Sequence, residues 1–90
     1  MNSDRVYVDV NVEFTSEGDM RPRSLVWEDG RRYEIDRVKD VRTAHASRGG
    51  GTGDRYTVLV KGRERYLYFE HCGDEFAART GRWFLERKEA

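Results

Sequence analysis

Side chains that can ligate a metal gather in one short run near the C-terminus. The run contains His71, Cys72, Asp74 and Glu75. A structural zinc site usually needs four ligands with a recognisable pairing of spacings. The second histidine, His45, is far away in the sequence, and there is no second cysteine. The spacing therefore predicts no metal site, and we expect no cofactor.

Cys72 would be a candidate nucleophile if His71 activated its thiol. Neighbouring residues in a strand point to opposite faces of the sheet, so adjacency in the sequence disfavours the hydrogen bond that activation requires. No serine lies in a nucleophile-elbow motif, and the carboxylates are scattered along polar segments. The sequence therefore predicts that the chain is not an enzyme.

A glycine-rich segment, SRGGGTGD, spans residues 47–54. A phosphate-binding loop leads from a strand into a helix and usually ends in Lys-Ser or Lys-Thr. Here a strand pattern follows, and no Gly-Lys-Ser/Thr is present. We interpret residues 49–53 as a flexible loop between two strands. Whether this loop clasps a partner is left open.

Tyrosine and basic residues gather around a predicted pair of strands in the second half of the chain. The candidate binding face consists of Arg55, Lys61, Arg63, Arg65, Tyr66 and Tyr68. Tyrosine and arginine are enriched at protein interfaces, and an open sheet edge accepts a partner strand or a second copy of the chain. The leading interpretation is a non-enzymatic binding module for an unknown protein or for itself, as a homodimer.

Single-stranded nucleic acid is the alternative partner for the same face. Small barrels bind single strands by stacking bases on aromatic side chains, with Arg and Lys on the phosphates. Tyr66 and Tyr68 would supply the rings. The chain has 17 basic and 17 acidic residues, so its net charge of zero gives no strong field to attract a polyanion, which weakens this alternative.

The clearest strand pattern is an alternation over residues 6–14. Its apolar row is Val6, Val8, Val10, Val12 and Phe14, and the intervening positions are mostly polar. Such period-two alternation predicts a half-buried strand with the valine row and Phe14 inward. Residues 16–19 then form a turn, and Pro22 is expected in the connection because it lacks a ladder donor.

A second strand pair is predicted around the Asp-Gly at positions 29 and 30. Glycine can take the positive φ that such a turn requires. Keeping the apolar residues on one face pairs Trp27 with Tyr33 and Leu25 with Ile35, with residues 29–31 as a three-residue loop. Beyond residue 35 the alternation breaks, which predicts one long, bulged strand running to about residue 46.

A third strand pair is predicted over residues 55–60 and 65–71. With Gly62 as the first central residue of a type II′ turn, Val58 faces Leu67 and Tyr56 faces Phe69. Residues 74–79 are predicted to form a short helical turn before a last strand over residues 82–87. The fold prediction is all-β: a six-stranded antiparallel meander curled into a small SH3-like or OB-like barrel, with sandwich packing as the alternative.

Length and composition bound the protein to a single small domain over residues 1–90. The single cysteine excludes an internal disulfide, and no apolar run is long enough for a signal peptide or a membrane span. We therefore expect a cytoplasmic protein with no membrane partner.

One composite motif resembles a known group. The pattern W-x-D-G-R-x-Y-x-I-D-x-V over residues 27–38, with the terminal R-W-F-L-E of residues 82–86, is similar to small uncharacterised bacterial β proteins. The resemblance implies a β fold and a bacterial source. That group has no known function, so the resemblance implies no activity, cofactor or partner.

Overall fold

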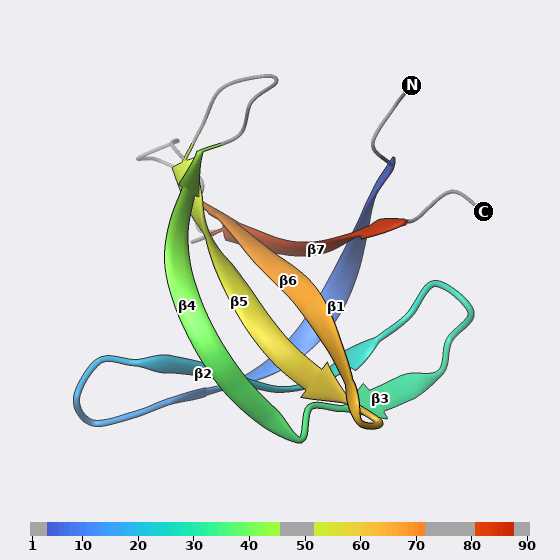
Figure 1. The fold of residues 1–90 in the computed structure, drawn as a ribbon, viewed down its shortest axis with the longest axis horizontal. Helices are drawn as coiled ribbons and strands as arrows, with labels where there is room; N and C mark the ends of the chain where they lie inside the picture. The colour runs from blue at the N-terminus through green and yellow to red at the C-terminus, as the bar shows by residue number, and fades with distance from the viewer. Residues whose placement is uncertain (1–3, 46–51, 72–80, 88–90) are drawn as a thin grey trace.

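The computed structural model describes residues 4–45, 52–71 and 81–87, and all regular structure within these ranges is β-strand (Figure 1). The strands are β1 (Asp4–Phe14), β2 (Met20–Val26), β3 (Arg32–Glu34), β4 (Arg37–His45), β5 (Thr52–Val60), β6 (Arg63–His71) and β7 (Gly81–Arg87). The described ranges contain no helix that could cross a membrane. The predicted helical turn over residues 74–79 lies outside the described residues.

The strands form one antiparallel sheet in the order β3-β2-β1-β7-β6-β5-β4. Strand β1 links its two halves, because residues 4–8 pair with β7 and residues 9–14 pair with β2. The sheet is strongly curved, with β4, β5 and β6 sweeping side by side around one side of the molecule (Figure 1). The all-β, antiparallel prediction is confirmed, and the sheet is curled into a half-barrel.

The described residues form seven strands instead of the predicted six, because the long strand expected to run to residue 46 is interrupted at Ile35 and Asp36. The Ile35 amide donates to the Arg23 carbonyl of β2, and the next amide, of Asp36, donates to the Leu59 carbonyl of β5, each at 2.8 Å. The chain therefore crosses from one half of the sheet to the other within two residues. The predicted bulge is present at Lys39, where the β4–β5 register shifts.

The hairpin between β2 and β3 keeps the predicted faces but has a different register. Leu25 pairs with Tyr33, not with Ile35, and the three-residue loop is 28–30 instead of 29–31. The Gly30 amide donates to the Trp27 carbonyl and the Trp27 amide donates to the Arg31 carbonyl, so Gly30, at φ 84°, occupies the left-handed position that closes the turn. A slip of two residues leaves every side chain on its expected face.

The hairpin between β5 and β6 shows the same kind of shift. Tyr56 pairs with Leu67 and Val58 with Arg65, so the predicted pairing of Val58 with Leu67 is wrong by two residues. The loop is Lys61-Gly62, with φ values of 51° and 77°. Positive φ at both central residues makes this a type I′ turn and not the predicted type II′ turn, in which only the first central residue has positive φ.

The core lies on the concave side of the sheet, where Val58 and Leu67 are fully buried. It consists of Leu25, Ile35, Tyr56, Val58, Leu67, Phe69 and Trp83, with the β1 valines, Trp27 and Tyr33 packed against it. Trp83 anchors the aromatic part, with ring centroids 5.1 Å from Tyr56 and 4.8 Å from Phe69. Trp27 and Tyr33 thus face the same apolar interior, as the alternation predicts.

Two predictions about the first strand pair are wrong. Phe14 is 69% exposed, because it pairs with Met20 beside the turn, beyond the end of the core. Pro22 lies inside β2 and is fully buried, not in a connection. Along β1, Asn11 pairs with Ser24 and the next residue, Val12, pairs with Pro22, so β2 has a bulge at Arg23. A bulge is one of the few positions in a sheet that tolerate proline.

Candidate functional site

The six residues of the predicted binding face divide between two surfaces. Residues on β6 alternate between faces, and the pairing of Arg65 with buried Val58 places Arg63 and Arg65 on the concave side, at the end of the core. Tyr66 and Tyr68 lie on the convex outer face, where Arg55 pairs with Tyr68 across the ladder. Lys61 lies in the turn that joins β5 and β6.

The outer face carries a row of aromatic rings across three neighbouring strands. Tyr68 of β6, Phe84 of β7 and Tyr7 of β1 are successive cross-strand partners. Tyr68 stacks on Phe84 at 5.0 Å with an interplanar angle of 7°, and Tyr7 meets Phe84 edge-on at 5.5 Å. Their mutual packing leaves Phe84 only 6% exposed although it is on the outer face.

Arginine side chains of the same surface cover these rings. The Arg5 guanidinium lies 4.6 Å from the Phe84 centroid, and that of Arg82 lies 4.1 Å from the Tyr7 centroid. Arg55 covers Tyr66 at 4.4 Å. Cation–π contacts of this kind stabilise the cluster but occupy ring faces that base stacking would need.

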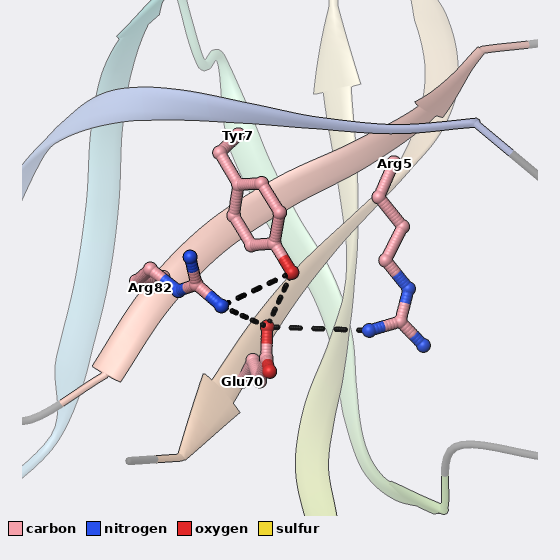
Figure 2. Close-up of polar contacts among 4 residues, drawn as sticks. All are labelled: Arg5, Tyr7, Glu70 and Arg82. Atoms are coloured by element: carbon pink, nitrogen blue, oxygen red, sulfur yellow. Dashed lines mark hydrogen bonds and ion pairs between the residues drawn. The ribbon is translucent and has the colours of Figure 1, made fainter. Parts of the chain in front are cut away.

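Glu70 is the polar centre of this cluster (Figure 2). The Tyr7 hydroxyl donates a hydrogen bond of 2.7 Å to Glu70 Oε1. The same oxygen lies 3.6 Å from a guanidinium nitrogen of Arg82 and 4.0 Å from one of Arg5. The carboxylate therefore balances part of the arginine charge within the protein.

A groove opens where β6 and β7 separate. The β6–β7 ladder covers residues 68–71 and 81–84 and stops at the pair Tyr68–Phe84, although β6 extends back to Arg63 and β7 extends on to Arg87. Over residues 84–87, β7 instead follows β1, with Leu85 paired to Val6. The facing stretches of β6 and β7 thus lie along an opening of about 770 Å³.

The groove combines an apolar floor with a basic rim. Its lining includes the apolar or aromatic side chains Leu25, Trp27, Tyr33, Val60, Leu85 and Tyr68. Burial raises the pKa of the Tyr68 phenol, and the nearby Glu86 carboxylate raises it further, so this hydroxyl stays neutral at physiological pH. Among the described residues, the charged lining is four basic side chains, Lys61, Arg63, Arg65 and Arg87, and two acidic ones, Glu64 and Glu86.

Three of the basic side chains at this rim have no ion pair with any carboxylate in the described part of the chain. Lys61 lies 5.3 Å from the centroid of the Tyr33 ring, and Arg63 and Arg65 are exposed. By contrast, Arg87 binds both carboxylate oxygens of Glu28 at 2.7 and 2.8 Å, and Glu64 is paired with Lys39. The groove therefore has unbalanced positive charge beside apolar surface.

A second groove, of about 880 Å³, is lined by the crossing residues Ile35 and Asp36, by the end of β1 and its turn into β2, and by residues of β2, β4 and β5. Within the described ranges its charged lining is balanced, with three basic and three acidic residues: Arg21, Arg23, Arg37, Asp19, Asp36 and Asp54. The exposed side chains of Phe14 and Val41 flank it. Equal numbers of both signs give this groove no preference for a charged partner.

Sequence reasoning found the basic rim but missed the floor of the groove and the outer cluster. Tyr7 had a usable signal, because it is the one aromatic residue in the polar row of the first strand. Phe84 had another, because it neighbours the inward Trp83 and must point outward. The floor of the groove had no comparable signal in the sequence, because it forms from strands that are distant along the chain.

Two surfaces thus stand out: the outer aromatic cluster, whose arginines lie on ring faces and around the Glu70 carboxylate, and the β6–β7 groove, where Arg63 and Arg65 have no such partner among the described residues. Comparison of the chain with protein-family models, with curated protein sequences and with solved structures finds no match.

Proposed function

We propose that this protein is a non-enzymatic binding module that holds a segment of a partner protein in the β6–β7 groove. The observation that carries the proposal is the position of Lys61, Arg63 and Arg65, unpaired within the described chain, beside an apolar floor. Central apolar and aromatic anchors surrounded by a polar rim are the usual anatomy of a protein interface.

The physical gain on binding would come from the floor. Trp27 and Tyr33 are only partly buried, so a partner side chain seated against them removes further apolar surface from water. The basic rim would steer an acidic partner to the groove and fix its orientation more than it adds affinity.

The outer tyrosine face supports nucleic-acid binding less well. Base stacking needs an accessible ring face, and the Tyr66 and Tyr7 rings are each covered by an arginine. Glu70 also places a carboxylate at the centre of the cluster, where it would repel phosphate. A protein partner in the groove is therefore the better-supported function, and an oligonucleotide serves as the comparison ligand in the test.

The experiment begins with a displayed library of random nine-residue peptides selected on the folded protein. An enriched peptide is then titrated into ¹⁵N-labelled protein, and amide chemical shifts are followed. We expect saturable shifts concentrated on Trp27, Tyr33, residues 63–66 and residues 85–87.

A single-stranded oligonucleotide of mixed sequence is titrated in parallel, and light scattering reports the oligomeric state. Enrichment of no peptide, or shifts centred on Tyr7 and Arg82, would overturn the proposal. Oligonucleotide binding that weakens steeply with salt would favour nucleic acid instead. A dimer whose interface covers the groove would also contradict a foreign partner, because the second copy would then be the ligand.

A further inference from the structure

The turn between β5 and β6 determines to which side of β6 the backbone N–H and C=O groups of each residue point. In a two-residue hairpin the residues that flank the loop are hydrogen-bonded to each other, so the Arg63 amide points to Val60 of β5. The backbone groups of successive residues point to alternate sides of the strand. Those of Arg65 and Leu67 therefore also point to β5, whereas those of Glu64 and Tyr66 point away from β5.

An independent hydrogen bond agrees with this assignment. The Leu59 carbonyl accepts from the Asp36 amide, so the Leu59 backbone faces β4 and not β6. Leu59 and its partner Glu64 are therefore a non-hydrogen-bonded pair. The backbone of Glu64 consequently faces the side of β6 on which β7 would lie.

On that side the ladder is incomplete. The last pair of the β6–β7 ladder is Tyr68 with Phe84. If the ladder continued, the next hydrogen-bonded pair would be Tyr66 of β6 with Glu86 of β7, but these two residues are not partners. The backbone N–H and C=O groups of Glu64 and Tyr66 thus lie along the groove that opens where β7 separates from β6. An unpaired strand edge of this kind is a template for an added strand.

We infer that the partner segment binds as an extended strand added to β6 along residues 63–67, with acidic side chains opposite Arg63 and Arg65. The inference rests on the proposed function and deepens it by naming the chemistry and conformation of the partner. Arg63 and Arg65 point to the concave side, so every second residue of an added strand faces them. At the next position that faces the concave side, beyond the two acidic residues, an apolar side chain of the partner lies against Trp27 and Leu85.

Charge complementarity selects an acidic segment. The groove has four basic and two acidic side chains, and of the acidic ones Glu64 is already paired with Lys39. The second groove, with three of each, provides the comparison within the same molecule. A basic segment would add to the positive charge at the rim, and a neutral one would leave Arg63 and Arg65 unpaired.

The first arm of the test is a charge reversal. A random nine-residue peptide library is selected on the wild type, on Arg63→Glu/Arg65→Glu, and on the matched control Arg21→Glu/Arg37→Glu, which reverses two exposed arginines at the second groove. We expect wild type and control to enrich acidic residues at alternate positions, and the groove variant to lose affinity for these peptides about tenfold. Circular dichroism and thermal unfolding verify that each variant is folded.

The second arm tests the backbone pairing. One enriched peptide is synthesised with N-methyl groups on alternate residues, in both phases. Strand addition requires that one phase abolish binding, because its amides face β6, and that the other phase bind within a few-fold of the parent. A peptide held by side chains alone would respond similarly to both phases.

The outcomes separate the two levels of the proposal. If the library yields no peptide that shifts groove resonances, the proposed function fails. If peptides occupy the groove but are not acidic, keep their affinity on Arg63→Glu/Arg65→Glu, or respond equally to both methylation phases, only the strand-addition inference fails.

Discussion

Glu70 is the side chain on the outer face whose replacement should be felt most. Its carboxylate accepts a hydrogen bond of 2.7 Å from the Tyr7 hydroxyl and lies between Arg5 and Arg82. About a third of the Glu70 side chain is exposed. Glu70→Gln removes the one negative charge that faces Arg5 and Arg82. We expect the free energy of unfolding in urea to fall by about 1 kcal/mol, because hydrogen bonds to charged groups are stronger than neutral ones but solvent screens this one in part.

Glu64→Gln is the matched control. Glu64 forms a single ion pair with Lys39, and both side chains are more exposed than Glu70. An isolated surface pair contributes about 0–1 kcal/mol and often nothing measurable. Equal losses for the two variants would show that the outer cluster adds nothing beyond an ordinary surface ion pair.

Two tyrosines give the stability of the protein a defined dependence on alkaline pH. Burial raises the pKa of Tyr56 and of Tyr68 above the ordinary value of 10.0, and nearby carboxylates, first Asp54 for Tyr56 and Glu86 for Tyr68, raise it further. Above about pH 10 the unfolded chain therefore releases these protons before the folded chain does. The contribution of these two tyrosines to the free energy of unfolding is fully retained below that pH, and it is lost as the pH rises through their raised folded-state pKa values.

The corresponding measurement compares wild type with Tyr56→Phe/Tyr68→Phe in urea at about pH 8 and about pH 10.5. The wild type should lose more stability between the two conditions, because the variant has lost the two phenols that ionise more readily when unfolded. An identical loss in both proteins would contradict the pKa directions.

At the scale of the elements, the Lys61-Gly62 turn decides the register of β5 and β6. Lys61 is the one non-glycine residue with positive φ in the described chain, and a left-handed conformation costs a residue other than Gly, Asn or Asp about 1–2 kcal/mol. Lys61→Asn creates the Asn-Gly pair that type I′ turns favour. We expect the urea midpoint to rise by the equivalent of about 0.5–1 kcal/mol.

The same variant tests the alternative register. If the loop were Gly62-Arg63, residue 61 would lie in the strand, where asparagine is unfavourable. A lower urea midpoint for Lys61→Asn would therefore support that register and contradict the one observed.

The turns also show what the sequence could and could not predict about the fold. Alternation correctly placed Trp27 and Tyr33 on the core side and Tyr66 on the other. It could not fix the register, because a shift of two residues moves no side chain to a different face. The difference lies in the φ values of Gly30, Lys61 and Gly62, which composition alone does not determine.

The candidate site was predictable only in part for a related reason. Arg63, Arg65 and Lys61 were identified because they cluster in the sequence. The groove itself exists because β7 leaves β6 after Phe84 to follow β1, so that residues from β2, β3, β6 and β7 meet. Local periodicity carries no information about where two paired strands separate.

At the scale of the whole molecule, the half-barrel has a charge asymmetry that its net charge of zero hides. The groove between β6 and β7 is rimmed mainly by basic residues, and the second groove carries equal numbers of both signs. The sheet thus has two grooves, of which one has an excess of basic residues among its described lining. This asymmetry, together with the incomplete β6–β7 ladder, is the basis on which we propose a binding module.

The most direct test of the groove as the binding site is hydrogen exchange of individual amides with and without an enriched peptide. We expect the Glu64 and Tyr66 amides to exchange rapidly in the free protein and to become protected in the complex, whereas the Arg65 and Leu67 amides, bonded to β5, exchange slowly in both states. Protection confined to the outer face around Tyr7 and Arg82, with Glu64 and Tyr66 unchanged, would contradict this expectation.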